Sequence, residues 1–253
     1  RKLQNGNLII TSNEDMVIYH SRRFYEVDML GNIIQTYETP NYQHHEVMEH
    51  PNGNFLVATN STPIVLGNGL NQEDFIIEYS RNTGAPVRFW DFNLILDNQR
   101  LRLPGERPED WLHNNAIYYD EETDALIISG RAQSAVVSVD YESSEVNWII
   151  SDHYGWSGDL ATKLLTPVDE SGSPIDVSNI DFWPYGQHAA LTMPNGNILM
   201  YDNGSYRNFY RNRNAPAASY SRAIEYEIDT QNMTIRKVWE FDYNKTLFTP
   251  FTG

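Results

Sequence analysis

The sequence contains no cysteine among its 253 residues. Disulfide bonds, thiolate metal sites and cysteine nucleophiles are therefore excluded together. Basic residues are also scarce, because 18 Lys and Arg stand against 34 Asp and Glu, which gives a formal net charge of −16. Nucleic acids and anionic membrane surfaces are bound through basic footprints, so we expect neither as a partner. No apolar run approaches the roughly 20 residues of a membrane-spanning helix, so no membrane span is expected.

The sequence does contain an internal repeat. The segment QNGNLII at residues 4–10 recurs as PNGNFLV at 51–57 and as PNGNILM at 194–200, and a degenerate copy, DEETDALII, occupies 120–128. Asn-Gly between apolar runs predicts a β-hairpin, in which a type I′ turn needs positive φ at both central residues. We therefore expect a hairpin of that type at each full copy.

Further strand pairs follow the copies, each of the form strand, polar turn and strand. They occupy Ile76–Tyr79 with Val87–Trp90, Val136–Val139 with Val146–Ile149, and Ala223–Tyr226 with Val238–Phe241. Helical periodicity is nearly absent, and units of four antiparallel strands are typical of β-propeller blades, with a sandwich or a β-helix as alternatives. We predict an all-β fold, a β-propeller of four-stranded antiparallel blades, with about four blades in residues 1–253.

The spacing of the copies exceeds that of a bare blade. The excess lies in three irregular stretches, residues 60–74, 91–110 and 152–187, and long irregular loops in a compact domain often cover a functional site. The chain opens without an initiator Met or an apolar leader and ends on Thr249–Gly253 soon after a strand-like run. We interpret residues 1–253 as a single propeller domain cut at both ends.

Three of the seven histidines occupy similar places in successive repeats. His45 and His188 each stand six residues before the proline of their copy, and His113 lies one or two residues further from its turn. Equivalent positions on the inner strands of a propeller converge on the central channel, so we expect these imidazoles to meet at one end of it. The loops at 91–110 and 152–187 are expected over the same end. His20, His50 and His153 fall outside this pattern, and we interpret them as surface or loop residues.

Other residues near these histidines extend the candidate site. Arg131 ends an apolar strand and therefore needs an anion or a carboxylate partner, which is either a substrate or an ion pair with Glu46 or Asp202. Asp202 either orients a histidine or forms a turn. Aromatic residues just before the histidines would line the same opening or serve as core filler; they are Tyr42, Trp111, Trp183 and Tyr185.

At these residues a family resemblance becomes visible. The segment YQHHE at 42–46, followed by PNGN, resembles the His-His-acidic motif of bacterial arylsulfate sulfotransferases. DWLHNNA at 110–116 and SGRAQ at 129–133 resemble the family's Trp-x-His-x-Asn and Ser-x-Arg-x-Gln segments. GQH at 186–188 with MYDNG at 200–204 resembles its Gln-His and Phe-Asp-Asn-Gly pair. The motifs occur in order from about Tyr42 to the end of the chain.

The resemblance implies a six-bladed propeller that transfers a sulfuryl group from an aryl sulfate to a phenol by a ping-pong mechanism, without a nucleotide sulfate donor. It implies that His188 is transiently sulfated, that His113 and Arg131 bind the sulfuryl oxygens, and that His44 or His45 lies nearby. The residues matched as substrate-binding are Trp111, Asn115, Tyr185, Asp202 and Asn203. No cofactor and no metal are expected, the location implied is periplasmic or secreted, and a homo-oligomer is possible.

The chain departs from the family pattern in two respects. Ala132 stands where the family often has a histidine, and a chain without cysteine lacks the disulfide of periplasmic members. Two alternatives remain. One is a metal-dependent enzyme with His45, His113, His188 and Glu46 as ligands, which the nearby Arg131 disfavours. The other is a propeller that acts as a binding scaffold without catalysis.

Overall fold

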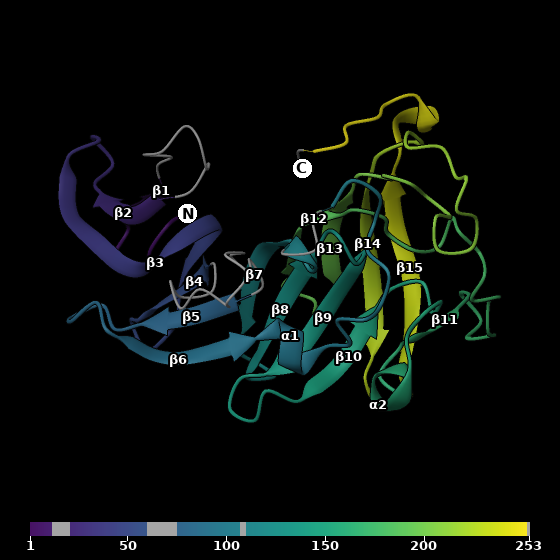
Figure 1. Ribbon diagram of the computed structural model, residues 1–253, viewed down its shortest axis with the longest axis horizontal. Helices are drawn as coiled ribbons and strands as arrows, with labels where there is room; N and C mark the ends of the chain where they lie inside the picture. The colour runs from purple at the N-terminus through teal and green to yellow at the C-terminus, as the bar shows by residue number, and fades with distance from the viewer. Residues whose placement is uncertain (12–20, 60–74, 107–109, 252–253) are drawn as a thin grey trace. The chain divides into compact units, whose positions relative to one another are not determined.

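The computed structural model describes residues 1–11, 21–59, 75–106 and 110–251. It separates into two compact units, the first running from Arg1 to Phe92 and the second taking up most of the chain from Asn93 onward. Both are built from mainly antiparallel sheets (Figure 1). The helical segments in the described part are short: α1 (Phe92–Ile95), α2 (Gly158–Ala161) and the 3₁₀ turn η2 (Tyr243–Lys245). The prediction of an all-β propeller fold is confirmed, whereas the number of blades in the whole protein stays a prediction.

The first unit contains one sheet of six strands in chain order. They are β1 (Leu8–Thr11), β2 (Ser21–Val27), β3 (Ile33–Glu49), β4 (Phe55–Thr59), β5 (Phe75–Tyr79) and β6 (Pro86–Asp91). The first half of β3 pairs with β2, while its second half pairs with β4. We interpret the sheet as two blades that share β3. The second half of β3 with β4, β5 and β6 makes four antiparallel strands, as predicted for a blade, and the described part of the first blade has three strands.

The second unit contains two sheets that stand next to each other (Figure 1). One has the order β10-β9-β8-β7 and the other β11-β15-β14-β13-β12. The strands are β7 (Asn114–Asp120), β8 (Ala125–Gly130), β9 (Ala135–Asp140), β10 (Val146–Ile150), β11 (Thr166–Val168), β12 (His188–Thr192), β13 (Ile198–Asp202), β14 (Arg222–Asp229) and β15 (Thr234–Phe241). Each sheet therefore has the four antiparallel strands of a blade, and β11 adds a parallel strand to the edge of the second.

The Asn-Gly repeats form hairpins of a different turn type from the one predicted. Positive φ is confined to the glycine, with 90° at Gly6, 88° at Gly53 and 81° at Gly196. In the second copy the Gly53 amide donates to the His50 carbonyl at 2.8 Å, and the His50 amide donates to the Asn54 carbonyl at 2.9 Å. This is a type I turn followed by a glycine bulge. The hairpins are confirmed and the type I′ assignment is wrong.

Each Asn-Gly-Asn turn also binds a glutamate on the strand that follows the hairpin. The side-chain amides of Asn52 and Asn54 donate to Oε1 of Glu78 at 2.8 and 2.7 Å. The other full copies repeat this arrangement, with Asn5 and Asn7 on Glu26, and Asn195 and Asn197 on Glu225. Hydrogen bonds to a carboxylate are stronger than those between neutral groups, so this contact ties the hairpin to the next strand of its blade.

The degenerate repeat lacks both partners of that contact. Residues 120–124 read DEETD, and the corresponding strand residue is Ser138, whose hydroxyl accepts a hydrogen bond from Asn147 at 3.2 Å. A glutamate beside this acidic turn would be repelled by it. The loss of the asparagines and the loss of the glutamate are therefore physically coupled.

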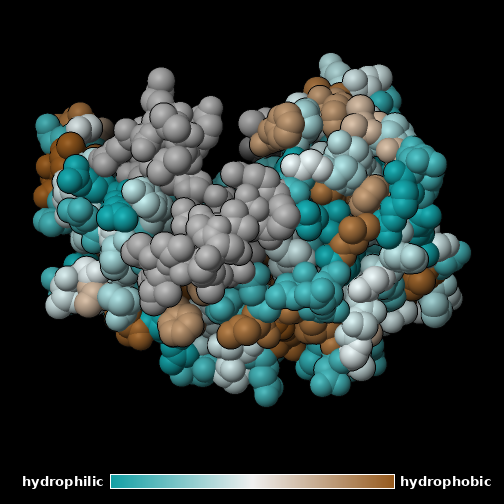
Figure 2. All heavy atoms as spheres, in the orientation of Figure 1, coloured by the Kyte–Doolittle hydropathy of each residue, from teal (hydrophilic) through white to brown (hydrophobic). Residues whose placement is uncertain are grey.

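Each unit has its own apolar core. In the first, Phe24 and Phe55 pack edge to face with ring centroids 5.1 Å apart, and in the second the core includes Trp183 and Tyr226. His50, expected at the surface, is buried. On the coloured part of the face in Figure 2, hydrophobic side chains form separate patches among hydrophilic ones. No helix in the described ranges is long and apolar enough to cross a bilayer.

Candidate active site

In the second unit, the predicted site histidines lie where the first strand of a blade begins. His188 is the first residue of β12, and His113 directly precedes β7. The strand pairing shifts register just after each of them, and φ is 53° at His113 and 55° at Ala189. Positive φ is uncommon outside glycine, and bulges of this kind redirect side chains next to active sites. The backbone irregularity therefore distinguishes these two positions from the rest of the sheet.

His188 is held by Asn203 in a defined orientation. Nδ1 of His188 lies 2.7 Å from Oδ1 of Asn203, and Nδ2 of Asn203 donates to the Thr249 carbonyl at 2.7 Å. Because the Asn203 amide nitrogen donates to a carbonyl, its oxygen faces the imidazole and can only accept. Nδ1 of His188 therefore carries the proton, and the lone pair of the neutral ring is on Nε2.

Burial keeps the His188 imidazole neutral. It lowers the pKa of His188 from 6.5 to about 4, and although the Asn203 hydrogen bond opposes this, the positive charges of Arg131 and His113 act in the same direction as burial. The ring is therefore unprotonated at neutral pH. The influence of Arg131 and His113 on its pKa also indicates that these two side chains and His188 lie in one neighbourhood.

Arg131 follows β8 and is tied to His113 through the backbone. Its amide donates to the His113 carbonyl at 3.1 Å, and burial lowers the pKa of its guanidinium. The guanidinium forms an ion pair with Glu106, and its Cζ lies 5.5 Å from the ring centroid of Phe251. The predicted ion-pair partners, Glu46 and Asp202, are therefore replaced by Glu106, a residue that the sequence did not single out.

Glu106 also approaches His113. Its Oε2 lies 3.5 Å from Nδ1 of His113, whose side chain is 20% exposed. Glu106 belongs to the 91–110 stretch, so its described part reaches the candidate site. The 152–187 stretch contributes α2 (Gly158–Ala161) and then β11 (Thr166–Val168) at the outer edge of the last sheet, and its position over the same end of the channel stays a prediction. The 60–74 stretch and His20 lie outside the described residues.

Gln187 and Asn115 join the two sheets beneath these side chains. The Asn115 side-chain amide donates to the Gln187 carbonyl at 2.7 Å, and Nε2 of Gln187 donates to the Ala135 carbonyl at 2.8 Å. Among the described residues, Oδ1 of Asn115 and Oε1 of Gln187 are buried without a hydrogen-bond partner. Asn115 is predicted to bind substrate. Its side-chain NH2 group instead donates to the backbone carbonyl of Gln187, the residue before His188, and only its side-chain oxygen remains without a hydrogen-bond partner.

Two residues predicted to bind substrate lie in the interior instead. Asp202 is fully buried and pairs with Arg207 and Arg222 at 2.9 and 2.8 Å. The Tyr185 side chain is also fully buried, and its hydroxyl donates to Asp152 at 3.1 Å. The expectation of direct substrate contact is corrected for both, because their polar atoms are bound within the protein.

The remaining predicted substrate contacts also have partners within the protein. Trp111 is buried, and its Nε1 donates to the Arg100 carbonyl at 3.0 Å. Asn203 binds His188 and the Thr249 carbonyl. The structure thus gives Asn203 a role in orienting His188, in place of the predicted contact with substrate.

His44 and His45 belong to the first unit, in β3. His45 has a φ of 52°, so the same backbone irregularity recurs here. Nδ1 of His44 lies 3.0 Å from Nδ1 of His45, and His44 is buried while His45 is exposed. Glu46 forms an ion pair with Arg1 at 2.5 Å. That these histidines join the cluster of the second unit stays a prediction.

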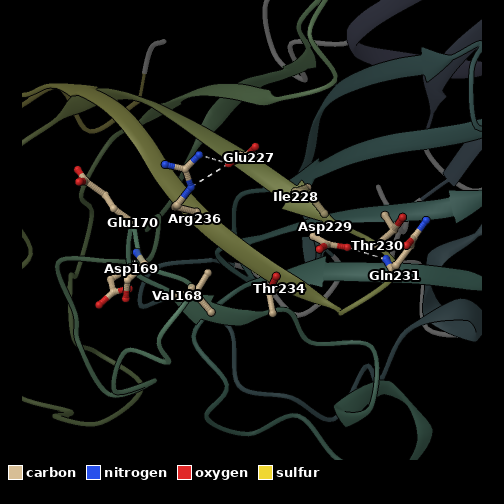
Figure 3. Close-up of a pocket in the computed structure, with 12 residues that line it drawn as sticks. Val168, Asp169, Glu170, Glu227, Ile228, Asp229, Thr230, Gln231, Thr234 and Arg236 are labelled. Carbon is tan, nitrogen blue, oxygen red and sulfur yellow. Dashed lines mark hydrogen bonds and ion pairs between the residues drawn. The ribbon is translucent and has the colours of Figure 1, made fainter.

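A cavity in the described part of the chain lies elsewhere, at the junction of β11, β14 and β15 (Figure 3). Its polar side chains are used locally: Glu227 pairs with Arg236, while Asp169 and Asp229 accept hydrogen bonds from residues of their own turns. No residue of the predicted site lines it.

The family model described as arylsulfotransferase (ASST) matches residues 1–253. The chain belongs to the arylsulfotransferase family. Two curated relatives named arylsulfate sulfotransferase AssT, from Escherichia coli O6:H1 and from Lelliottia amnigena, are each 29% identical to this family member over 281 residues. The alignments cover 92% of this chain and 46% of each relative. The chain therefore spans about half the length of the curated relatives it matches.

A solved structure supports the fold of this chain. A protein of unknown function from Bacteroides caccae has a TM-score of 0.52 and 13% sequence identity, and the match covers 95% of this chain and 64% of that chain. At this identity the likeness shows the fold alone.

Proposed function

We propose that the whole protein is an arylsulfate sulfotransferase that moves a sulfuryl group from an aryl sulfate to a phenol through a sulfohistidine on His188. The orientation of His188 by Asn203 carries the proposal, because it leaves Nε2 of a neutral imidazole as the nucleophilic atom. The family and the names of the relatives support the reaction class. The donor and the phenolic acceptor are the only small molecules that this reaction needs.

In the first half-reaction, Nε2 of His188 attacks the sulfur of the donor. The N–S bond forms as the S–O(aryl) bond breaks, and the bonding electrons leave with the phenolate oxygen. By analogy with phosphoryl transfer, the transition state is loose and its charge lies mainly on the peripheral oxygens. A neutral imidazole is a competent nucleophile, and the buried surroundings of His188 keep it neutral.

Arg131 and His113 supply the positive charge and the N–H donors that the sulfuryl oxygens need. They are joined through the Arg131 amide and the His113 carbonyl, so their positions are set before substrate binds. Preorganised donors of this kind are worth roughly 10²–10³ in kcat when one is removed. The half-buried site strengthens them because water screens their charge less.

In the second half-reaction the sulfuryl group passes from His188 to the oxygen of the acceptor phenol. A phenol gives up its proton, its oxygen attacks the sulfur, and the N–S bond breaks so that its electrons return to Nε2 of His188. One of His44 and His45 is proposed as the acid that protonates the leaving phenolate and the base for the acceptor, a role worth roughly 10²–10⁴ in rate. We propose a periplasmic or secreted location from the family resemblance.

A metal-dependent reaction is the alternative. His113 and Glu106 are suitable ligand types, but the Arg131 guanidinium pairs with Glu106 and would repel a divalent cation at that carboxylate. A propeller that only binds a partner, without catalysis, does not explain why His188 is oriented or why the backbone is irregular at His113. These observations favour sulfuryl transfer over both.

The deciding assay uses 4-nitrophenyl sulfate and the complete natural protein. We expect nitrophenol release that a phenol stimulates and that a chelator does not affect. Loss of activity with a chelator, restored by zinc, would establish the metal-dependent alternative. No release under any of these conditions would favour the binding scaffold.

A further inference from the structure

The Glu106 carboxylate contacts both side chains that the proposed function assigns to binding the sulfuryl oxygens, Arg131 and His113. The carboxylate forms an ion pair with Arg131, and the two side chains are each 10% exposed. Its Oε2 also lies 3.5 Å from Nδ1 of His113. An anionic substrate and the Glu106 carboxylate therefore compete for the same guanidinium and the same imidazole.

The position of Glu106 is fixed by the segment that carries it. The amide of Leu103, a buried residue, donates to the carbonyl of Ala132, next to Arg131, at 2.7 Å. The Glu106 amide approaches the Leu103 carbonyl at 3.3 Å, and Nε of Arg102 donates to the Glu106 carbonyl at 2.8 Å. These hydrogen bonds hold the backbone of Glu106 close to Arg131, so the carboxylate reaches the guanidinium from an ordered segment.

Arg100 anchors the same segment from below. The Cζ atom of its guanidinium lies 4.5 and 4.2 Å from the ring centroids of Trp156 and Tyr210, and the guanidinium donates to the Gln133 carbonyl at 2.6 Å. A buried arginine that contacts two aromatic rings and a carbonyl is difficult to displace. The segment can therefore keep Glu106 in place while the carboxylate itself rotates away from Arg131.

We infer that Glu106 is a positioning residue that acts as an internal counter-ion of the anion site, and that the donor must displace it from Arg131 and His113. This inference rests on the proposed function for the identity of the donor. In the free enzyme the carboxylate neutralises the two cations and holds their side chains in place. Its presence weakens the binding of every sulfate anion, including inorganic sulfate, which would otherwise occupy the site.

The test replaces Glu106 by glutamine in the complete natural protein. Glutamine retains the size of the side chain but removes its charge, so E106Q should lower the KM for 4-nitrophenyl sulfate and the inhibition constant of inorganic sulfate, each about tenfold. A partly buried charged hydrogen bond is typically worth roughly this factor or more. The control is E227Q, which changes the net charge equally at the exposed ion pair with Arg236. It should leave both constants unchanged.

Other outcomes contradict the inference. If Glu106 merely supports the fold, E106Q raises KM or lowers thermal stability without tighter sulfate binding, and unchanged constants equally exclude a competing carboxylate. If E106Q does not fold, E106D keeps the charge but withdraws the carboxylate by one methylene, and it should shift both constants in the same direction by less. A rise in both constants for E106D would overturn the inference.

Calorimetric titration with inorganic sulfate separates this inference from the proposed function. Binding requires no turnover, so tighter binding by E106Q in a protein that does not cleave the ester would refute the proposed function alone. A protein that turns over the donor but whose E106Q variant binds sulfate no more tightly would refute the counter-ion alone.

Discussion

Asn203 fixes which nitrogen of His188 is available to react, because its side-chain oxygen lies 2.7 Å from Nδ1 while its nitrogen donates to the Thr249 carbonyl. The imidazole is thus held by a neutral acceptor, which selects the tautomer without adding a negative charge. A carboxylate in the same place would also select the tautomer but would favour the protonated ring. The choice of asparagine therefore keeps the His188 ring neutral as well as oriented.

Two substitutions of Asn203 separate orientation from charge. N203A should lower kcat about 10²-fold, the scale expected when a reacting group loses its alignment. N203D should retain more of the activity at neutral pH but should raise the pKa of His188. When the pH is lowered, its His188 ring therefore becomes protonated at a higher pH than in the wild type, and its activity should be lost at a higher pH. The measurement is the pH profile of kcat/KM for both variants. Superimposable profiles for N203D and wild type would contradict the assigned contact.

The lowered pKa of His188 also predicts how stability depends on pH. The unfolded chain binds a proton at His188 near pH 6.5, whereas the folded chain does so only near pH 4, so the unfolded state gains protons first as the pH falls. The free energy of unfolding should therefore decline between about pH 6.5 and pH 4, by up to about 3 kcal/mol at roughly 1.4 kcal/mol per pKa unit.

Urea denaturation of the wild type and H188Q at a series of pH values measures this contribution. The difference between the two curves should appear only below about pH 6.5 and should stop growing below about pH 4. H153Q is a second test, since burial lowers the pKa of His153 as well, so the difference between H153Q and the wild type should also grow as the pH falls. A pH-independent difference for H188Q would show that the folded protein protonates His188 as readily as the unfolded chain.

The repeat made the fold predictable from the sequence. The Asn-Gly-Asn copies mark hairpins because only glycine is at ease at positive φ there, and alternating apolar residues mark the strands between them. The turn type was mispredicted because the loop is one residue longer than a two-residue Asn-Gly turn, so that only the glycine adopts positive φ, and the asparagine side chains are left to bind Glu78 and its counterparts. Such a contact depends on which strands become neighbours and is not encoded in the turn itself.

The candidate site was predictable only where it follows the repeat or a family motif. His113, Arg131 and His188 stood out for these reasons, and the structure brings their side chains into one neighbourhood. Glu106 did not stand out, because it reaches Arg131 from an irregular segment whose path is set by Leu103 and Arg100. The roles of Asp202 and Asn203 were also not separable in sequence, since Asp202 ends β13 and Asn203 directly follows it, and the sequence does not show which of two adjacent polar residues faces His188. One faces the buried arginines, and the other faces His188.

The glutamate contacts of the turns should contribute stability without affecting catalysis. E225A removes the acceptor of Asn195 and Asn197 and should lower the free energy of unfolding by about 1–3 kcal/mol, the usual result of leaving donors unpaired. The measurement is urea denaturation, with a double-mutant cycle between E225A and N197A. A coupling energy near zero would contradict the contact. S138A, in the degenerate repeat, is the control with a smaller expected loss.

The covalent intermediate should form on Nε2 of His188. H188A should abolish both half-reactions, whereas H113A and R131A should slow them roughly 10²–10³-fold and preserve the ping-pong pattern, since neither residue bonds to sulfur. Quenching after addition of 4-nitrophenyl sulfate alone, without a phenol, should leave a sulfated peptide that contains His188. An N-sulfonate is stable in base and labile in acid, and spectroscopy of the peptide should place the group on Nε2, because Nδ1 faces Asn203 in the folded protein. An adduct on His113, or on Nδ1 of His188, would retain the reaction class and refute this assignment of roles.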